Sequence, residues 1–166
     1  MVTLGNPQRI SCSYPEYKDG WNVTACPDGT LVDNNTNREL YSLYWEGADF
    51  NASVTEEGFI VKREDTIKFL EEKLDILGLS NKEAEEFIIY WLPKLQESEY
   101  NYIRFTSKEE IDEYMPLEFS KEPDTLIRVH MQFKNLDEPI EVREQNLQKQ
   151  QRNGFTVVEW GGTEII

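Results

Sequence analysis

The sequence predicts an α+β fold in which an antiparallel helix pair packs on one side of an antiparallel sheet. Three observations predict it. Short runs of aromatic and β-branched residues, separated by turn residues, fill residues 1–62, as in a β-meander. Apolar residues then recur every three or four positions across residues 65–97, which is the period of amphipathic helices. Strand-like patterns return in residues 100–166, and the whole length of 166 residues suits a single domain, 1–166.

Five strands are expected in the first part of the chain. Pro, Gly, Asn and Asp, which favour tight turns, separate them. The expected strands cover residues 10–14, 21–26, 30–33, 40–45 and 59–62. Because the connections are short, we expect neighbouring strands to pair in an antiparallel way.

Two helices are expected next. The first covers residues 66–77, with Asp65 as its N-cap and Gly78 as the residue that stops it. The second begins after Ser80, whose spacing to Glu83 matches a capping box, in which each side chain accepts a hydrogen bond from the other residue's backbone. Since the connection is short, the helices should be antiparallel neighbours.

The last third of the chain returns to strands, with one short helix among them. The expected elements are a strand at 101–106, a helix at 107–114 and strands at 126–133, 140–144 and 155–160. Apolar and polar residues alternate cleanly in residues 126–133, as in a strand with one buried face. We expect Gly161 and Gly162 to break the final strand.

The composition describes an acidic, aromatic-rich globular protein. Hydrophobic residues make up 39% of the chain and aromatic residues 12%, which argues against disorder. The formal net charge of −15 should repel nucleic-acid phosphates and anionic lipid headgroups. We therefore expect neither nucleic-acid binding nor membrane insertion, and the sequence contains no apolar run long enough to cross a bilayer.

Five sequence blocks cover residues 14–31, 40–47, 87–95, 123–133 and 153–164. Together they resemble an uncharacterised bacterial domain family that is often found in extracytoplasmic proteins, and the last block, NGFTVVEWGGTE, is the most specific. The resemblance implies a secreted or surface-anchored protein, with a cytoplasmic one as the alternative. It implies no activity and no catalytic residues. Because an upstream strand typical of the family is absent, we expect this chain to be a domain excised from a longer protein.

Aromatic residues are the main candidates for a binding site. Trp21, Tyr41, Tyr44 and Trp45 lie in the early part of the expected sheet, close in sequence to acidic residues. Such side chains stack on sugars or anchor protein interfaces. The alternative is that these residues form the core, because most Trp side chains are largely buried.

Cys12 and Cys26 are candidates for a disulfide. If the strands that carry them pair around Asp19, the two cysteines lie opposite each other at a distance that permits an S–S bond. The alternative is two reduced, buried cysteines. Two cysteines and one histidine are too few for a closed zinc site, so we expect neither metal nor cofactor.

The motifs favour a protein without catalytic activity, although they do not exclude an enzyme. The only histidine, His130, falls on the polar side of its expected strand, where we expect an exposed residue rather than an oriented base. We expect a non-catalytic accessory or interaction domain that binds a protein or a glycan. The alternatives are a carboxylate-based hydrolase acting on carbohydrate or peptidoglycan, and an acidic inhibitor that mimics nucleic acid.

Overall fold

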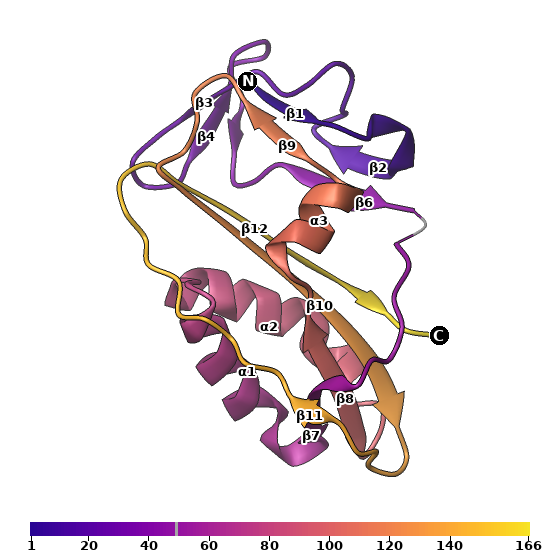
Figure 1. Ribbon diagram of the computed structural model, residues 1–166. Helices are drawn as coiled ribbons and strands as arrows, with labels where there is room; N and C mark the ends of the chain where they lie inside the picture. The colour runs from indigo at the N-terminus through magenta and orange to yellow at the C-terminus, as the bar shows by residue number, and fades with distance from the viewer. Residues whose placement is uncertain (49) are drawn as a thin grey trace. The chain divides into compact units, whose positions relative to one another are not determined.

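The chain divides into two compact units. A computed structural model describes residues 1–48 and 50–166 (Figure 1). Unit 1 comprises Met1–Phe50 and Glu109–Glu122, and unit 2 comprises Asn51–Lys108 and Pro123–Ile166. Each unit therefore combines two separate stretches of chain, which the sequence pattern does not indicate. The single domain stays a prediction.

Unit 1 consists of short antiparallel strands. They are β1 (Val2–Leu4), β2 (Ile10–Tyr14), β3 (Val23–Ala25), β4 (Leu31–Asp33), β5 (Glu39–Leu40), β6 (Tyr44–Gly47) and β9 (Leu117–Phe119). Strand β1 pairs with β9, β2 pairs with β6, and β3, β4 and β5 form a sheet of their own. A short helix, α3 (Lys108–Tyr114), precedes β9.

The core of unit 1 is small and centres on a tryptophan. Leu4, Trp21 and Met115 are buried together. The Nε1–H of Trp21 donates a hydrogen bond to the carbonyl oxygen of Pro15 at 2.8 Å, so burial leaves its polar atom satisfied. The Tyr17 ring meets Trp21 edge-on, with 4.8 Å between the ring centroids.

Unit 2 contains a five-stranded sheet and two longer helices. The elements are β7 (Glu57–Lys62), α1 (Thr66–Ile76), α2 (Asn81–Leu95), β8 (Tyr100–Phe105), β10 (Thr125–Leu136), β11 (Arg143–Glu144) and β12 (Thr156–Glu164). The strand order is β11-β7-β8-β10-β12. The three central strands are antiparallel, whereas β11 and β12 run parallel to their neighbours at the two edges. These elements give the protein the α+β class that the sequence predicts.

The helices α1 and α2 contact each other and share one buried core with the strands (Figure 1). Leu70 and Leu74 of α1 and Phe87, Trp91 and Leu95 of α2 belong to the same cluster as the apolar residues of β7, β8 and β10. These residues recur at helical spacing, which explains why the periodicity located both helices. In the described part of the chain, no helix combines the length and the apolar composition needed to cross a bilayer.

Local signals at the helix ends act as expected, with one exception. Gly78 has a φ of 88°, and the N–H of Leu79 donates to the carbonyl of Leu74 at 3.0 Å, which closes a Schellman motif at the end of α1. Ser80 and Glu83 form the capping box of α2. Asp65 is the N-cap of α1 by position, but its side chain makes no capping hydrogen bond.

Two strand predictions are wrong in detail. The strand expected at 40–45 is divided into β5 and β6, with irregular chain between them. The final strand does not break at Gly161 and Gly162, because β12 continues through both to Glu164. A Cβ atom on Gly162 would lie 2.7 Å from the Met131 carbonyl oxygen and 2.9 Å from the Trp91 ring. This glycine therefore permits close packing rather than a turn.

Candidate binding site in unit 1

The four predicted aromatic residues differ in exposure. Trp21 keeps only 5% of its surface exposed, whereas Tyr41 keeps 59% and Tyr44 keeps 43%. Trp45 is partly buried and packs against the core of unit 1. The two tyrosines are therefore accessible to a ligand, while the two tryptophans mainly contribute to the core of unit 1.

The register of β2 and β6 creates an exposed tyrosine pair. Tyr14 lies directly opposite Tyr44, and Cys12 lies opposite Glu46. Opposed residues of an antiparallel pair project from the same face, so these four side chains share one face. Tyr14 is 50% exposed, similar to Tyr44. Trp45, between Tyr44 and Glu46, turns to the other face, toward the core.

Tyr44 is held in place by a carboxylate. Its hydroxyl donates a hydrogen bond to Oε1 of Glu46 at 2.8 Å, and Cys12 Sγ lies 3.9 Å from the same hydroxyl. Partial burial, followed by this hydrogen bond and the Glu46 charge, raises the pKa of Tyr44 above its usual value. The phenol therefore stays neutral, and its ring is oriented before any ligand arrives.

A pocket of about 260 Å³ lies next to Trp21. Its lining includes Trp21 together with Pro15, Asn22, Asp33, Asn35 and Thr36. The pocket is smaller than sites for drug-sized ligands, which start at roughly 300 Å³. Glu16, Lys18, Gly20 and Val23 complete the lining, so polar and charged side chains stand beside apolar ones. A small ligand that has both hydroxyl groups and apolar C–H surface would match this mixture.

The loop that lines the pocket is shaped by Asp33. Its carboxylate accepts hydrogen bonds from the Thr36 hydroxyl at 2.6 Å and from the Asn35 backbone N–H at 2.9 Å. The Thr36 hydrogen bond, followed by the one from Asn35, lowers the pKa of Asp33. Asn37 has a φ of 56°, which completes the turn.

In residues 1–48 and 50–166, no group of three or more His, Cys, Asp or Glu side chains could hold a metal ion.

Arg38 contacts one member of the tyrosine pair. This residue follows the pocket loop, and its guanidinium lies over the Tyr14 ring, 5.9 Å from the centroid. Pro15, which directly follows Tyr14, lines the pocket itself. Tyr14 is thus a site residue that the sequence reasoning missed. Its position at the end of an expected strand beside a turn was the available signal.

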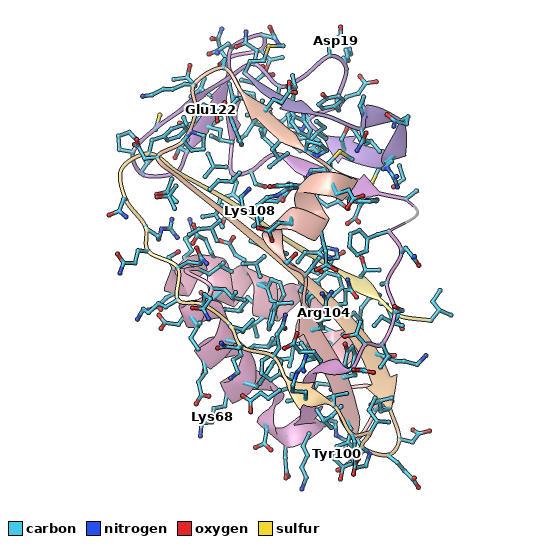
Figure 2. The ribbon with its side chains drawn as sticks, viewed as in Figure 1. Asp19, Lys68, Tyr100, Arg104, Lys108 and Glu122 are labelled. Atoms are coloured by element: carbon cyan, nitrogen blue, oxygen red, sulfur yellow. The ribbon has the colours of Figure 1, made fainter. Side chains whose placement is uncertain are left out.

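The strand pairing on which the candidate disulfide between Cys12 and Cys26 rests is wrong. Strand β2 pairs with β6 rather than with β3, so Cys12 faces Glu46 instead of Cys26. Both cysteines are free, with Cys12 exposed and Cys26 half-buried. Figure 2 shows Asp19 in the long loop after β2, which is not a hairpin turn. The expectation failed because a connection of this length need not join paired strands.

The histidine of unit 2 lies in a separate polar cluster. Nδ1 of His130 is 2.9 Å from the Thr106 hydroxyl, and Nε2 is 3.1 Å from the Thr163 hydroxyl. Nearby on β10, Arg128 donates a hydrogen bond to Glu159 of β12 at 2.6 Å. His130 is half-buried rather than exposed, and both ring nitrogens have hydroxyl partners. The cluster joins β10 to β12, which is a structural role.

Comparisons with known proteins add no assignment: no family model, no curated protein and no solved structure matches the chain. The resemblance to a bacterial domain family therefore stays a prediction. The candidate site rests on its geometry alone.

Proposed function

We propose that this chain is a non-catalytic interaction domain that binds a glycan through unit 1. The observation that carries the proposal is the pocket beside Trp21, with the exposed Tyr14 directly before the lining residue Pro15 in the chain. A sugar has hydroxyl groups at its edge and C–H groups on its faces. The loop around Asn35 would take the hydroxyl groups, and tyrosine rings would stack on the faces.

A glycan fits this site better than a protein does. The exposed rings of Tyr14 and Tyr44 lie beside Arg38 and Glu46, and the pocket lining combines polar side chains with those of Pro15, Trp21 and Val23. Protein interfaces instead concentrate their binding energy in a well-packed centre from which water is excluded. A glycan ligand also agrees with the extracytoplasmic location that we propose for the protein.

The geometry gives less support to a hydrolase. A carboxylate mechanism needs two acids across a cleft, one of them kept protonated by a raised pKa. Two acids, Glu16 and Asp33, line the pocket, and hydrogen bonds lower the pKa of Asp33, which is the opposite of what a general acid needs. Burial raises the pKa of Glu86, but this residue lies on α2 in the other unit and does not line the pocket beside Trp21.

An array of oligosaccharides that includes peptidoglycan fragments tests the proposal. We expect the protein to bind at least one glycan on the array. In solution titrations with that glycan, Tyr14→Ala and Asn35→Ala should each weaken binding by about tenfold, or roughly 1.4 kcal/mol. Their sites lie on the tyrosine face and in the pocket, so both surfaces are tested.

Tyr90→Ala is the matched control, because Tyr90 is also 50% exposed but lies on α2. It should leave the affinity unchanged. An array without any bound glycan would overturn the glycan proposal. Equal affinities for the wild-type protein, Tyr14→Ala and Asn35→Ala would show that the glycan binds elsewhere.

A further inference from the structure

Strand β12 ends the five-stranded sheet, and none of the described residues forms a strand on its outer side. It is 9 residues long and pairs with β10 over its whole length without a register shift. An edge strand exposes backbone groups that can pair with another chain. Natural edges are often protected by proline, by a bulge or by charged side chains. Strand β12 has no proline, lysine or bulge, and its two charged residues are neutralised within the chain, Glu159 by Arg128 and Glu164 by Lys94.

The backbone hydrogen bonds show which residues of β12 face outward. The carbonyl of Phe155 accepts from the N–H of Thr125, and the N–H of Ile165 donates to the carbonyl of Phe133. In a parallel pair, each strand directs the N–H and C=O of alternate residues to the same neighbour. The odd-numbered residues of β12 therefore direct their backbone N–H and C=O groups to β10, and the even-numbered residues direct theirs to the outer side of the sheet. The outward residues are Thr156, Val158, Trp160, Gly162 and Glu164.

We propose that two copies of this chain associate through these free edges, with their β12 strands antiparallel about a two-fold axis at Trp160. Trp160 is the middle residue of β12, so this register pairs all of the outward residues. Thr156 lies opposite Glu164, Val158 opposite Gly162, and Trp160 opposite its own copy. Each pair can exchange two backbone hydrogen bonds. No like charges lie opposite each other in these pairs or in the pairs formed by the odd-numbered residues between them.

Helix α2 provides a second, independent observation. The Tyr90 ring lies 6.1 Å from the Trp160 ring, and Lys94 forms an ion pair with Glu164 at 3.3 Å. The side of α2 that carries Tyr90 and Lys94 therefore lies along β12. Glu86, Tyr90 and Lys94 are spaced four residues apart, so they form one row on the helix. Tyr90 in this row is half exposed although it is aromatic.

The same two-fold axis makes the helix row self-complementary. Two antiparallel α2 helices centred on Tyr90 place Glu86 of one copy opposite Lys94 of the other. Trp91 contacts Phe133 of β10 and approaches Gly162 of β12, so α2 lies above this strand pair. A strand spacing of about 4.8 Å then puts the two α2 axes ~10 Å apart. Packed helices are separated by 8–10 Å.

Amide hydrogen exchange followed by NMR over a dilution series tests the pairing. At high concentration we expect a dimer in sedimentation, with slow exchange at Val158, Trp160, Gly162 and Glu164. On dilution to monomer, these amides should exchange at least ~tenfold faster, while the intervening amides stay protected by β10. A protein that remains monomeric at millimolar concentration would overturn the proposal. A dimer without this alternating change would also overturn it.

Two sets of variants keep the test specific. Val158→Pro removes an outward N–H, and Val158→Ala removes the side chain but keeps that donor. The proline variant should raise the dimer dissociation constant by ~tenfold or more relative to the alanine variant, with circular dichroism confirming the fold.

Lys94→Glu should also weaken the dimer. Adding Glu86→Lys should restore it, whereas failure of this charge swap would contradict the helix contact.

Discussion

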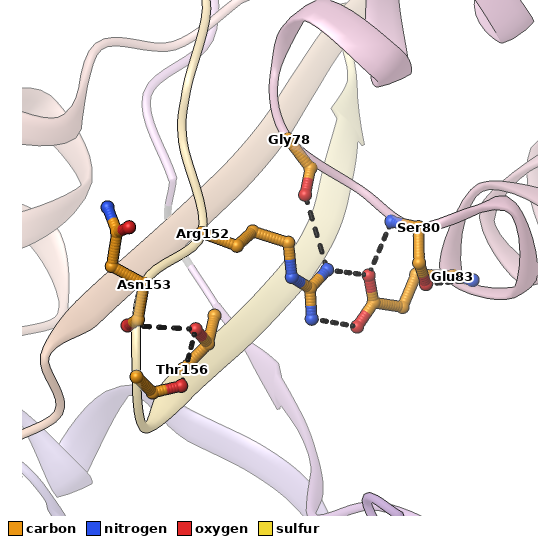
Figure 3. A network of polar contacts seen from close by, with 7 residues as sticks. Gly78, Ser80, Glu83, Arg152, Asn153 and Thr156 are labelled. Atoms are coloured by element: carbon orange, nitrogen blue, oxygen red, sulfur yellow. Dashed lines mark hydrogen bonds and ion pairs between the residues drawn. The ribbon is translucent and has the colours of Figure 1, made fainter.

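At the scale of single residues, Glu83 connects three parts of unit 2. Its carboxylate accepts a hydrogen bond from the Ser80 N–H at 2.7 Å and binds the Arg152 guanidinium through both oxygens (Figure 3). Arg152 also donates to the carbonyl of Gly78 at 3.2 Å. One carboxylate therefore joins the end of α1 and the start of α2 to the chain that enters β12.

We predict that Glu83→Gln lowers the free energy of unfolding by about 1–2 kcal/mol, since it weakens both the capping box and a bidentate ion pair. Glu85→Gln is the matched control, because Glu85 is exposed on the same helix, and it should change stability by less than ~0.5 kcal/mol. Urea unfolding of both variants measures the difference. Equal effects of the two substitutions would contradict this role of Glu83.

The same contacts predict a pH dependence. Burial alone would raise the pKa of Glu83, but hydrogen bonds from Arg152 and Ser80 together outweigh it and lower the pKa below 4.5. A group with a lowered folded-state pKa stabilises the fold above its unfolded pKa and loses this effect as the pH falls through the folded value. The stability difference between wild type and Glu83→Gln should therefore shrink below about pH 4.5. Unfolding curves that keep a constant difference down to pH 2 would be inconsistent with this.

The two cysteines give a simple prediction at the same scale. Because Cys12 and Cys26 are free and lie on strands or turns that do not face each other, both thiols should react with Ellman's reagent in the native protein. Cys12 should react faster, since it is exposed and Cys26 is half-buried. A native protein whose thiols react only after reduction would instead contain the disulfide considered from the sequence.

At the scale of elements, packing between α2 and β12 depends on one glycine. We predict that Gly162→Ala destabilises the protein by about 1–3 kcal/mol, because its Cβ would overlap the Met131 carbonyl and the Trp91 ring. Gly161→Ala is the neighbouring control. Its Cβ would meet only the His130 ring, at 3.9 Å, so stability should stay equal or rise slightly. Thermal unfolding distinguishes the two, and a harmless Gly162→Ala would contradict this packing.

Elements that depend on local chemistry could be predicted from the sequence. Ser80, Glu83 and Gly78 mark helix ends through contacts within a few residues, so the spacing alone identified them. Strand pairing depends on distant residues. Nothing near Cys12 indicates that its partner strand is β6, and the resulting register determines which tyrosines share a face.

The candidate site was predictable only in part for the same reason. Tyr41 and Tyr44 are exposed, but residue type alone cannot distinguish them from Trp21, which fills the core. The pocket involves Pro15, Trp21 and the loop at Asn35, which are brought together by the tertiary fold. The full length of β12 was not predicted, because its two adjacent glycines indicate an early end to the strand.

At the scale of the whole molecule, the net charge of −15 should oppose self-association. Two acidic copies repel each other, and salt screens this repulsion, with a Debye length of about 10 Å at 0.1 M. We therefore predict that the β12-mediated dimer becomes tighter as sodium chloride rises from about 0.02 to 0.2 M. Sedimentation equilibrium measures the change. A dimer that weakens with salt would indicate an interface dominated by ion pairs instead.

In the two proposals the units serve different interactions, since unit 1 would bind a glycan and unit 2 a second copy of the chain. The central claim is the glycan site, and tyrosine-selective ¹³C labelling of the protein tests it most directly. On titration with a glycan found on the array, the ring signals of Tyr14 and Tyr44 should shift, while the signal of Tyr90 should stay in place. Shifts confined to Tyr90, or no shift in any tyrosine at saturation, would contradict the account.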